Sequence, residues 1–208
     1  MAERRRLSRV IHALEQASAW PGRLASWAVI LIMVFTVLSV LFSQLRIGVI
    51  ATWDVMLPLI GNRITLAGLT ELQWHFFGLM VMLGGAYALQ ADRHIRVDII
   101  YGQLGPRMRR AVDVLGDVVF LIPFCVVVAW LSLGYVERSY VTGERSDYGG
   151  LFDRYFIKSM IPIGLSLLAL AASFRVVRNL CQIFGVIEIH ESEYAKQEKQ
   201  DIEGRRGA

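Results

Sequence analysis

This sequence contains few cysteines, and long parts of the chain carry no charged residue. The two cysteines, Cys125 and Cys181, are far apart and form no Cys-x-x-Cys pair, which excludes a thiol redox motif and a cysteine metal site. The sequence also lacks a Ser/His/Asp arrangement suited to nucleophilic catalysis and a glycine-rich phosphate loop. Charged residues are absent from two stretches of twenty residues, 24–43 and 72–91. We therefore predict that the chain is not an enzyme.

Long apolar runs are what the sequence has instead. Each is close to the roughly 20 helical residues needed to cross a hydrocarbon layer of about 30 Å. Helices are favoured over a β-barrel, because a helix pairs its own backbone amides and the runs do not alternate in polarity. We predict an all-α integral membrane protein, with one four-helix domain over 1–185 and a charged, flexible tail over 186–208. The four predicted spans are 24–43, 72–91, 118–136 and 155–174.

Basic residues are distributed unevenly among the segments between the runs. Five Lys or Arg precede the first run, two follow it, five follow the second, three follow the third and six follow the fourth. The three after the third run are outnumbered by acidic residues. The positive-inside rule therefore predicts that both termini and the middle loop are cytoplasmic. This placement explains the net charge of +4 without a nucleic-acid partner.

Two segments outside the runs have the apolar spacing of short amphipathic helices. We expect the N-terminal one to lie on the headgroups until Pro21 and Gly22 turn the chain into the membrane. The middle loop is expected to form the other, and Pro106 then suits the first turn of the next helix. The apolar positions are Leu7, Val10, Ile11 and Leu14 in the first segment and Val97, Ile100, Tyr101 and Leu104 in the second.

Ionisable residues within or beside the runs lie near the predicted helix ends. A transport site should lie deeper in the bilayer, so we interpret these residues as structural anchors. Asp117 should need a partner from another helix or another chain, whereas Lys158 can extend its ammonium to the outer headgroups. The set consists of Glu71, His75, Asp113, Asp117 and Lys158.

The histidines of this sequence are not placed to bind a haem. His75 lies within a run, and His94 follows about 28 Å further along the helix, on the opposite side of the membrane. The two imidazoles cannot bracket one iron, and we predict no cofactor.

Small residues recur in the second and fourth runs and predict close helix packing in lipid. They are Gly78, Gly84, Gly85 and Ala88 in the second run, and Gly164, Ala169, Ala172 and Ser173 in the fourth.

A motif near the end of the second run resembles a known family. The segment 91–101 reads Ala-Asp-Arg-His-Ile-Arg-Val-Asp-Ile-Ile-Tyr, and Glu71-Leu72-Gln73-Trp74 opens the same run. With Gly149-Gly150 and with Lys158 followed by Ile161-Pro162-Ile163-Gly164, these residues resemble the small membrane subunit, DctQ-like, of tripartite ATP-independent periplasmic (TRAP) transporters. The resemblance covers 24–178. The long, apolar first outer loop, 44–71, and the charged tail depart from the family pattern.

The resemblance implies a bacterial inner-membrane protein with two partners. One would be a large membrane subunit of the elevator type, and the other a periplasmic solute-binding protein. Together they would import an organic acid on a sodium gradient, and the small subunit would brace the large one without holding substrate or sodium. In addition, we expect contacts with membrane lipids.

The resemblance also suggests roles for individual residues. His94, Arg96 and Asp98 would tie the middle loop to the helix ends, while Glu71 and Trp74 mark the outer end of the second span. Asp117 and Lys158 complete the predicted structural and interface set. Candidate contacts with the binding protein are Arg145, Asp147, Asp153 and Arg154.

Two other functions fit the four spans. A small homo-oligomeric carrier would need an embedded carboxylate or a polar pore face, and the first run offers only Thr36, Ser39 and Ser43. A membrane anchor for another complex fits the spans equally well, and the motif resemblance alone argues against it. Neighbouring genes for a permease and a secreted binding protein would favour the transporter.

Overall fold

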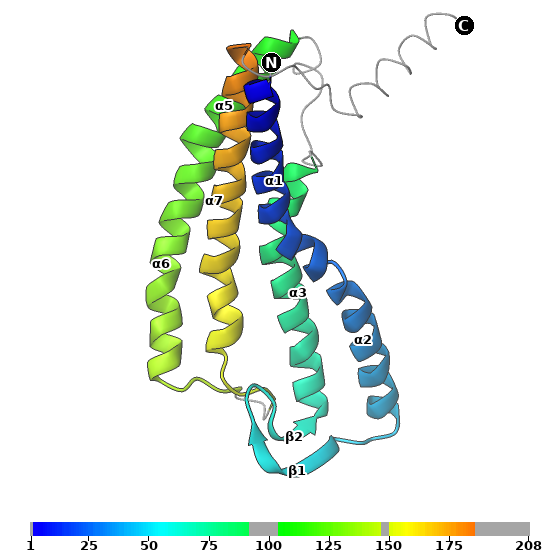
Figure 1. Cartoon of the computed structure of the whole chain (residues 1–208). Helices are drawn as coiled ribbons and strands as arrows, with labels where there is room; N and C mark the ends of the chain where they lie inside the picture. Colours follow the sequence, from blue (N-terminus) through cyan, green and yellow to red (C-terminus); the bar gives the residue numbers. More distant parts are fainter. Residues whose placement is uncertain (1, 92–103, 147–149, 186–208) are drawn as a thin grey trace, which may run out of the picture.

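The computed structural model describes residues 2–91, 104–146 and 150–185 (Figure 1). Within these residues, four helices are long and apolar enough to cross a membrane, and they overlap the four predicted spans. The predicted helical membrane protein with four crossings is therefore confirmed, whereas the expectation that the chain is all-α is wrong, because two strands occur in the first outer loop. The helical segments are Arg9–Gln44, Leu66–Gln90, Pro106–Val141 and Tyr155–Ile183.

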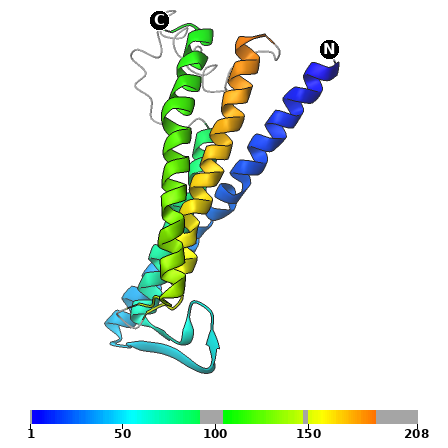
Figure 2. The same cartoon turned by 90° about the vertical axis from the view of Figure 1, so that its left-hand side faces the viewer.

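The first of these segments consists of two helices with a bend between them. Helix α1 (Ala2–Ala25) continues through Pro21, where we predicted a break, and α2 (Ala28–Gln44) follows after Ser26 and Trp27. The bend keeps helix-like hydrogen bonds, since the Ser26 N–H donates to the Gly22 carbonyl at 3.0 Å. Instead of standing apart as an interfacial helix, α1 packs against α3 and α7. Towards its N-terminus it leans away from the bundle (Figure 2).

An antiparallel β-hairpin occupies most of the first outer loop, which we described from the sequence only as long and apolar. Strand β1 (Val49–Leu57) pairs with β2 (Gly61–Thr65), with Val49 opposite Thr65 and Leu57 opposite Gly61. β-branched and aromatic residues favour strands, and Gly61, at a φ of +75°, provides the left-handed turn. The hairpin lies across one end of the bundle, which we call the hairpin end (Figure 1).

The second crossing is α3 (Leu66–Gln90), which directly follows β2. Thr65 caps it, because its hydroxyl accepts the Gly68 N–H at 3.0 Å. The third crossing is continuous from α5 (Pro106–Gly116) through a π-helical turn, η1 (Asp117–Leu121), into α6 (Ile122–Val141). Pro123 lacks an N–H, and the wider π turn just before it accommodates the missing bond. Pro106 lies in the first turn, as predicted.

The fourth crossing, α7 (Tyr155–Ile183), packs against both α3 and α6. Gly164 allows the approach to α3, because a Cβ there would lie 2.5 Å from the Met82 carbonyl oxygen. Towards the other end of the bundle, Ala86 and Leu89 of α3 form a buried cluster with Ala171 and Ala172 of α7. We call that other end, where α1 and α5 begin and α7 ends, the amino-terminal end.

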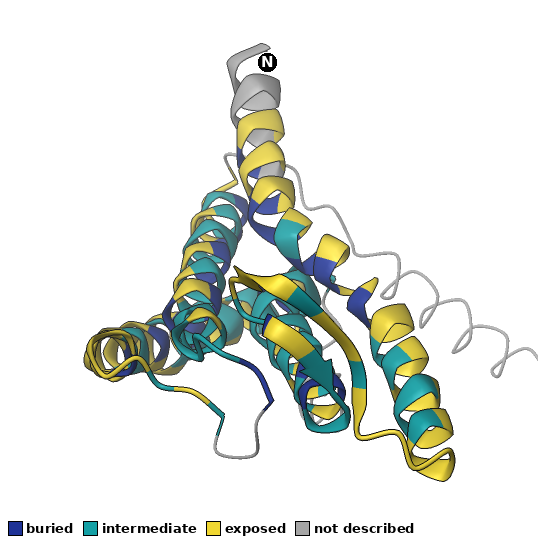
Figure 3. Cartoon of the chain, turned by 90° about the horizontal axis from the view of Figure 1, so that it is seen from below, coloured by how far each residue is buried: buried dark blue, intermediate teal, exposed yellow. Residues whose placement is uncertain are grey.

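Most of the apolar surface of the helices faces outward (Figure 3). In the most apolar part of each crossing, only 11 to 28% of the residues are buried inside the chain. Small buried residues hold the centre of the bundle, while large apolar side chains cover the outside. This inversion relative to a water-soluble protein suits lipid or a membrane partner.

Candidate functional site

Polar side chains join the helices at both ends of the bundle. At the hairpin end, Glu71 of α3 receives two donors from the α6–α7 connection, residues 142–154, of which 147–149 are not described. Its carboxylate accepts the Ser146 hydroxyl and, at 2.8 Å, the Leu151 N–H. Gly150 fits against the same carboxylate, since a Cβ there would lie 2.4 Å from an oxygen of Glu71. Glu71 therefore fixes the α6–α7 connection onto α3.

Lys158, in the first turns of α7, pairs with Glu144 of the same connection. Its ammonium also lies 3.9 Å from the centre of the Tyr135 ring of α6. The Lys158 side chain is only 13% exposed, so it is held inside the protein. This differs from our expectation that it extends to the outer headgroups. A nearby carboxylate and an aromatic face explain the difference, because both stabilise the cation inside the protein. The same hydrogen bond from Lys158 lowers the pKa of Glu144.

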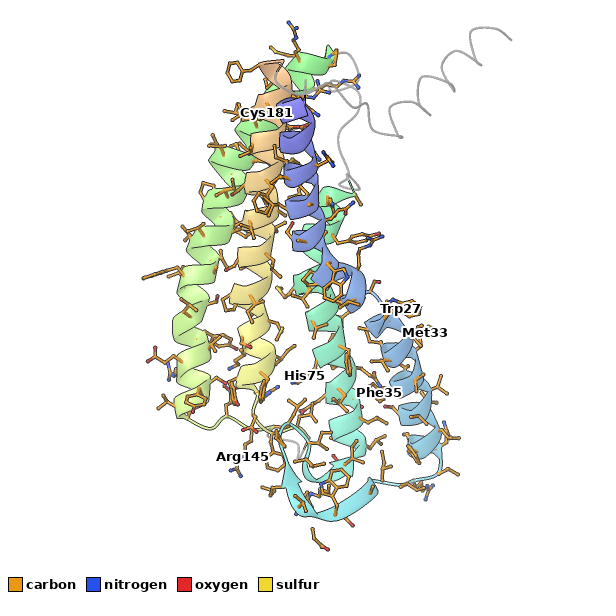
Figure 4. All side chains as sticks on the ribbon, viewed as in Figure 1. Trp27, Met33, Phe35, His75, Arg145 and Cys181 are labelled. Atoms are coloured by element: carbon orange, nitrogen blue, oxygen red, sulfur yellow. The ribbon has the colours of Figure 1, made fainter. Side chains whose placement is uncertain are left out.

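The four candidate contacts with a binding protein belong to this connection. Arg145 is exposed, and its guanidinium lies 5.3 Å from the centre of the Phe152 ring (Figure 4). Arg154 approaches Glu144 at 3.9 Å, and Asp153 adopts a left-handed φ of 52°. Asp147 lies outside the described residues.

The β-hairpin is attached to this connection by backbone and side-chain contacts. The Phe152 N–H donates to the Leu59 carbonyl at 2.7 Å, and Gly61 leaves room for the Phe152 ring. Within the hairpin, the Trp53 indole N–H donates to the Gly61 carbonyl at 2.9 Å. The hairpin, the connection and the start of α3 thus form one continuous surface at the hairpin end.

At the amino-terminal end, Asp117 is 2% exposed and forms a two-pronged ion pair with Arg175 of α7. One of its bonds, from Nε to Oδ2, measures 2.7 Å. Asp117 thus has the partner from another helix that its position required. Removing one member of a buried pair typically costs about 3–5 kcal/mol, so this contact couples the third crossing firmly to the fourth.

A second ion pair connects α1 to α7 at the same end. Glu15 is 4% exposed, and its carboxylate accepts a hydrogen bond from Nη1 of Arg178 at 2.9 Å. One turn further along α1, the Ser18 hydroxyl donates to the Glu15 carbonyl at 2.8 Å. This pair explains why α1 packs on the bundle, although its sequence also suits the membrane surface.

Between the two ends, fewer polar contacts occur among the described residues. Gln73 of α3 donates to Ser39 of α2 at 2.9 Å, which joins the first two crossings. His75 lies one turn after Glu71 on α3, and its Nδ1 is hydrogen-bonded to the Glu71 carbonyl at 2.8 Å. Trp74 points outward with 68% exposure and meets Phe77 edge to face at 6.3 Å. Its outward position suits an interfacial tryptophan.

The structure brings the predicted site residues into two groups and leaves part of the set undescribed. Glu71, Arg154 and Lys158 all contact residues of the α6–α7 connection at the hairpin end, Glu71 through Ser146 and the other two through Glu144, and Asp117 lies at the other end. His94, Arg96, Asp98 and Asp147 lie outside the described residues. Sequence reasoning missed Ser146, Glu144 and Arg175, the partners of Glu71, Lys158 and Asp117. It also missed the separate pair of Glu15 with Arg178. Arg175 and Arg178 were counted only for orientation, although their three-residue spacing on one helix could have suggested paired roles.

These features define an integral membrane protein whose crossings are tied together by ion pairs and hydrogen bonds at both ends. A family model described as "Tripartite ATP-independent periplasmic transporters, DctQ component" matches residues 47–182. The chain therefore belongs to the DctQ family and is one component of a tripartite transporter. The match extends from the start of the β-hairpin region to the end of α7. No curated protein and no solved structure matches the chain.

Proposed function

We propose that this chain is the small permease subunit that braces the large, elevator-type membrane subunit of a TRAP transporter. The complex would take up an organic acid on a sodium gradient, with a periplasmic protein delivering the solute. The chain would lie in the bacterial inner membrane with both termini in the cytoplasm. The observation that carries the proposal is the family match over 47–182.

The arrangement of polar groups supports a bracing role over a transporting one. The carboxylates of Glu71, Asp117 and Glu15 each accept hydrogen bonds from neighbouring segments, so they hold helices in place. The outer faces of the helices are apolar and exposed, which leaves a large area for a membrane partner. A brace needs such a rigid bundle with an apolar exterior.

Reconstitution tests the proposal directly. Proteoliposomes with this chain, the large subunit and the binding protein should take up solute when sodium is higher outside. Liposomes with this chain alone should show none, and those lacking it should lose most of the uptake. Sodium-driven uptake by the isolated chain would contradict the bracing role.

The motif at 91–101 is proposed to serve assembly. Arg96→Ala and Asp98→Ala should lower co-purification with the large subunit more than they change solute affinity. Unchanged co-purification with lost solute binding would contradict this role.

The exposed Arg145 and the adjacent Asp147, Asp153 and Arg154 are proposed to contact the binding protein at the hairpin end. Charge reversal at Arg145 should slow the association of the binding protein, and high salt should reduce the difference.

A further inference from the structure

The outer face of the bend between α1 and α2 carries two tryptophans on either side of an arginine. Trp20 is 60% exposed and Trp27 is 68% exposed, and Arg23 between them is also exposed. At about 100° per residue, positions 20, 23 and 27 share one side of a helix. The helix-like hydrogen bonds at Ser26 and Trp27 preserve this alignment through the bend. Figure 4 shows Trp27 pointing away from the bundle.

The opposite side of α1 makes the contacts with the bundle. Ser18, Ala19, Gly22 and Ala25 are buried there. At Gly22, a Cβ would lie 2.5 Å from the Leu83 carbonyl oxygen of α3. Because this side is fixed on α3, the Trp20–Arg23–Trp27 face must point outward from the protein.

The level of this face in the membrane follows from its neighbours. The charge-free run of the first crossing begins at Leu24, and Gly22 packs beside Leu83 and Tyr87 in the last turns of α3. From Leu24 to Gln44 a helix covers about 30 Å, the thickness of the hydrocarbon layer. The face therefore lies at the boundary between acyl chains and headgroups, where tryptophan is favoured.

Arg23 differs from Arg175 and Arg178, the two arginines of α7 at this end. Arg175 and Arg178 pair with Asp117 and Glu15, whereas Arg23 forms no ion pair with a carboxylate among the described residues. A guanidinium at headgroup depth is complementary to a lipid phosphate, which it can bind with two donors. Two indole rings beside it suit the same boundary.

An apolar stripe continues from this face along α2 towards the hairpin end. Its members follow Trp27 at helical spacing and are all exposed, which matches the path of an acyl chain below a phosphate. They are Ile30, Val34, Val37 and Leu41. We propose that the Trp20–Arg23–Trp27 face binds the phosphate of an anionic phospholipid and that this stripe holds one of its acyl chains.

Lipid binding to the full chain, purified in detergent, tests the site. Native mass spectrometry would compare phosphatidylglycerol with phosphatidylcholine for the unaltered chain, Arg23→Gln, Arg23→Lys and Arg107→Gln. Arg107 is the matched control, because it is an exposed arginine at the same end and has no aromatic residue three or four positions away. Arg23→Gln should weaken phosphatidylglycerol binding about fivefold, while Arg107→Gln should leave it unchanged. Arg23→Lys should keep part of the preference.

Three results would overturn the proposal. The unaltered chain could show no preference for the anionic lipid, or both glutamine variants could lose binding equally, which would indicate general charge attraction. Alternatively, Arg23→Gln could keep the lipid preference and lose co-purification with the large subunit, which would make the face a protein contact. Size-exclusion profiles would show that each variant is folded. None of these measurements depends on transport.

Discussion

Glu71 joins two segments that are far apart in the sequence, α3 and the α6–α7 connection, so its substitution should affect more than its own helix. Its carboxylate accepts donors from Ser146 and Leu151, and hydrogen bonds to a charged acceptor each contribute about 1.5–3 kcal/mol. Glu71→Gln replaces one accepting oxygen with an NH₂ group that faces a donor. We expect the free energy of unfolding to fall by about 2 kcal/mol, measured by denaturant unfolding in micelles. Glu137→Gln, at an exposed position near the same end, is the control, and an equal loss there would contradict the prediction.

Glu144 should make the stability of the fold depend on pH. The hydrogen bond from Lys158 lowers the pKa of Glu144 in the folded protein, so the pair stabilises the fold above the usual glutamate pKa of about 4.3. The contribution is lost as the pH falls through the lowered pKa. Unaltered protein should melt at a higher temperature than Glu144→Gln at about pH 7, and the difference should shrink below about pH 4. A difference that stays constant down to acid pH would contradict this account.

At the scale of elements, the attachment of α1 depends on a close crossing with α3. A Cβ at Gly22 would lie 2.5 Å from the Leu83 carbonyl oxygen and 2.8 Å from Tyr87 Cβ, whereas one at Gly84 meets nothing within 4 Å. Gly22→Ala should therefore push α1 off α3 and lower the free energy of unfolding by about 1–3 kcal/mol. Gly84→Ala should be neutral or slightly stabilising, because alanine favours a helix. Limited proteolysis of α1 and unfolding curves would check both, and equal behaviour of the two variants would contradict the crossing.

The membrane crossings could be predicted, because long apolar runs identify them. The position of α1 and the β-hairpin could not, because they depend on contacts between residues far apart in the sequence. Long apolar runs predicted the four crossings, and Pro106 predicted the start of the third. The helix was expected to break at Pro21, but the Glu15–Arg178 ion pair and the small face around Gly22 keep α1 on the bundle. The β-hairpin was missed because β1 is apolar on both sides and lacks a clear alternation, and β2 is only five residues long and mostly polar.

The same limit applies to the polar contacts. Glu71, Asp117 and Lys158 could be recognised from their positions near predicted helix ends. Their partners Ser146, Arg175 and Glu144 could not, because helix packing decides which residues meet. Arg175 lies fifty-eight residues from Asp117, and the sequence contains no local signal that joins them.

At the scale of the whole molecule, the two ends of the bundle have different characters. The hairpin end combines a β-hairpin with a connection rich in charged residues, which suits contacts with a protein outside the membrane. The amino-terminal end gathers α1, α5 and the end of α7, with Asp117–Arg175 and Glu15–Arg178 paired among them. The excess of arginine on that side predicts that it faces the cytoplasm.

Cysteine labelling would establish this orientation. In a background with Cys125→Ala and Cys181→Ser, Asn62→Cys places a thiol at an exposed position on the hairpin and Met108→Cys places one on α5, where the side chain is 60% exposed. If the hairpin end faces the periplasm, as the distribution of arginines predicts, a membrane-impermeant maleimide should label the Asn62→Cys variant in intact cells. The Met108→Cys variant should react only after the inner membrane is opened, and the cysteine-free background should not react at all. The reverse pattern would place the hairpin in the cytoplasm, where a periplasmic binding protein could not reach Arg145.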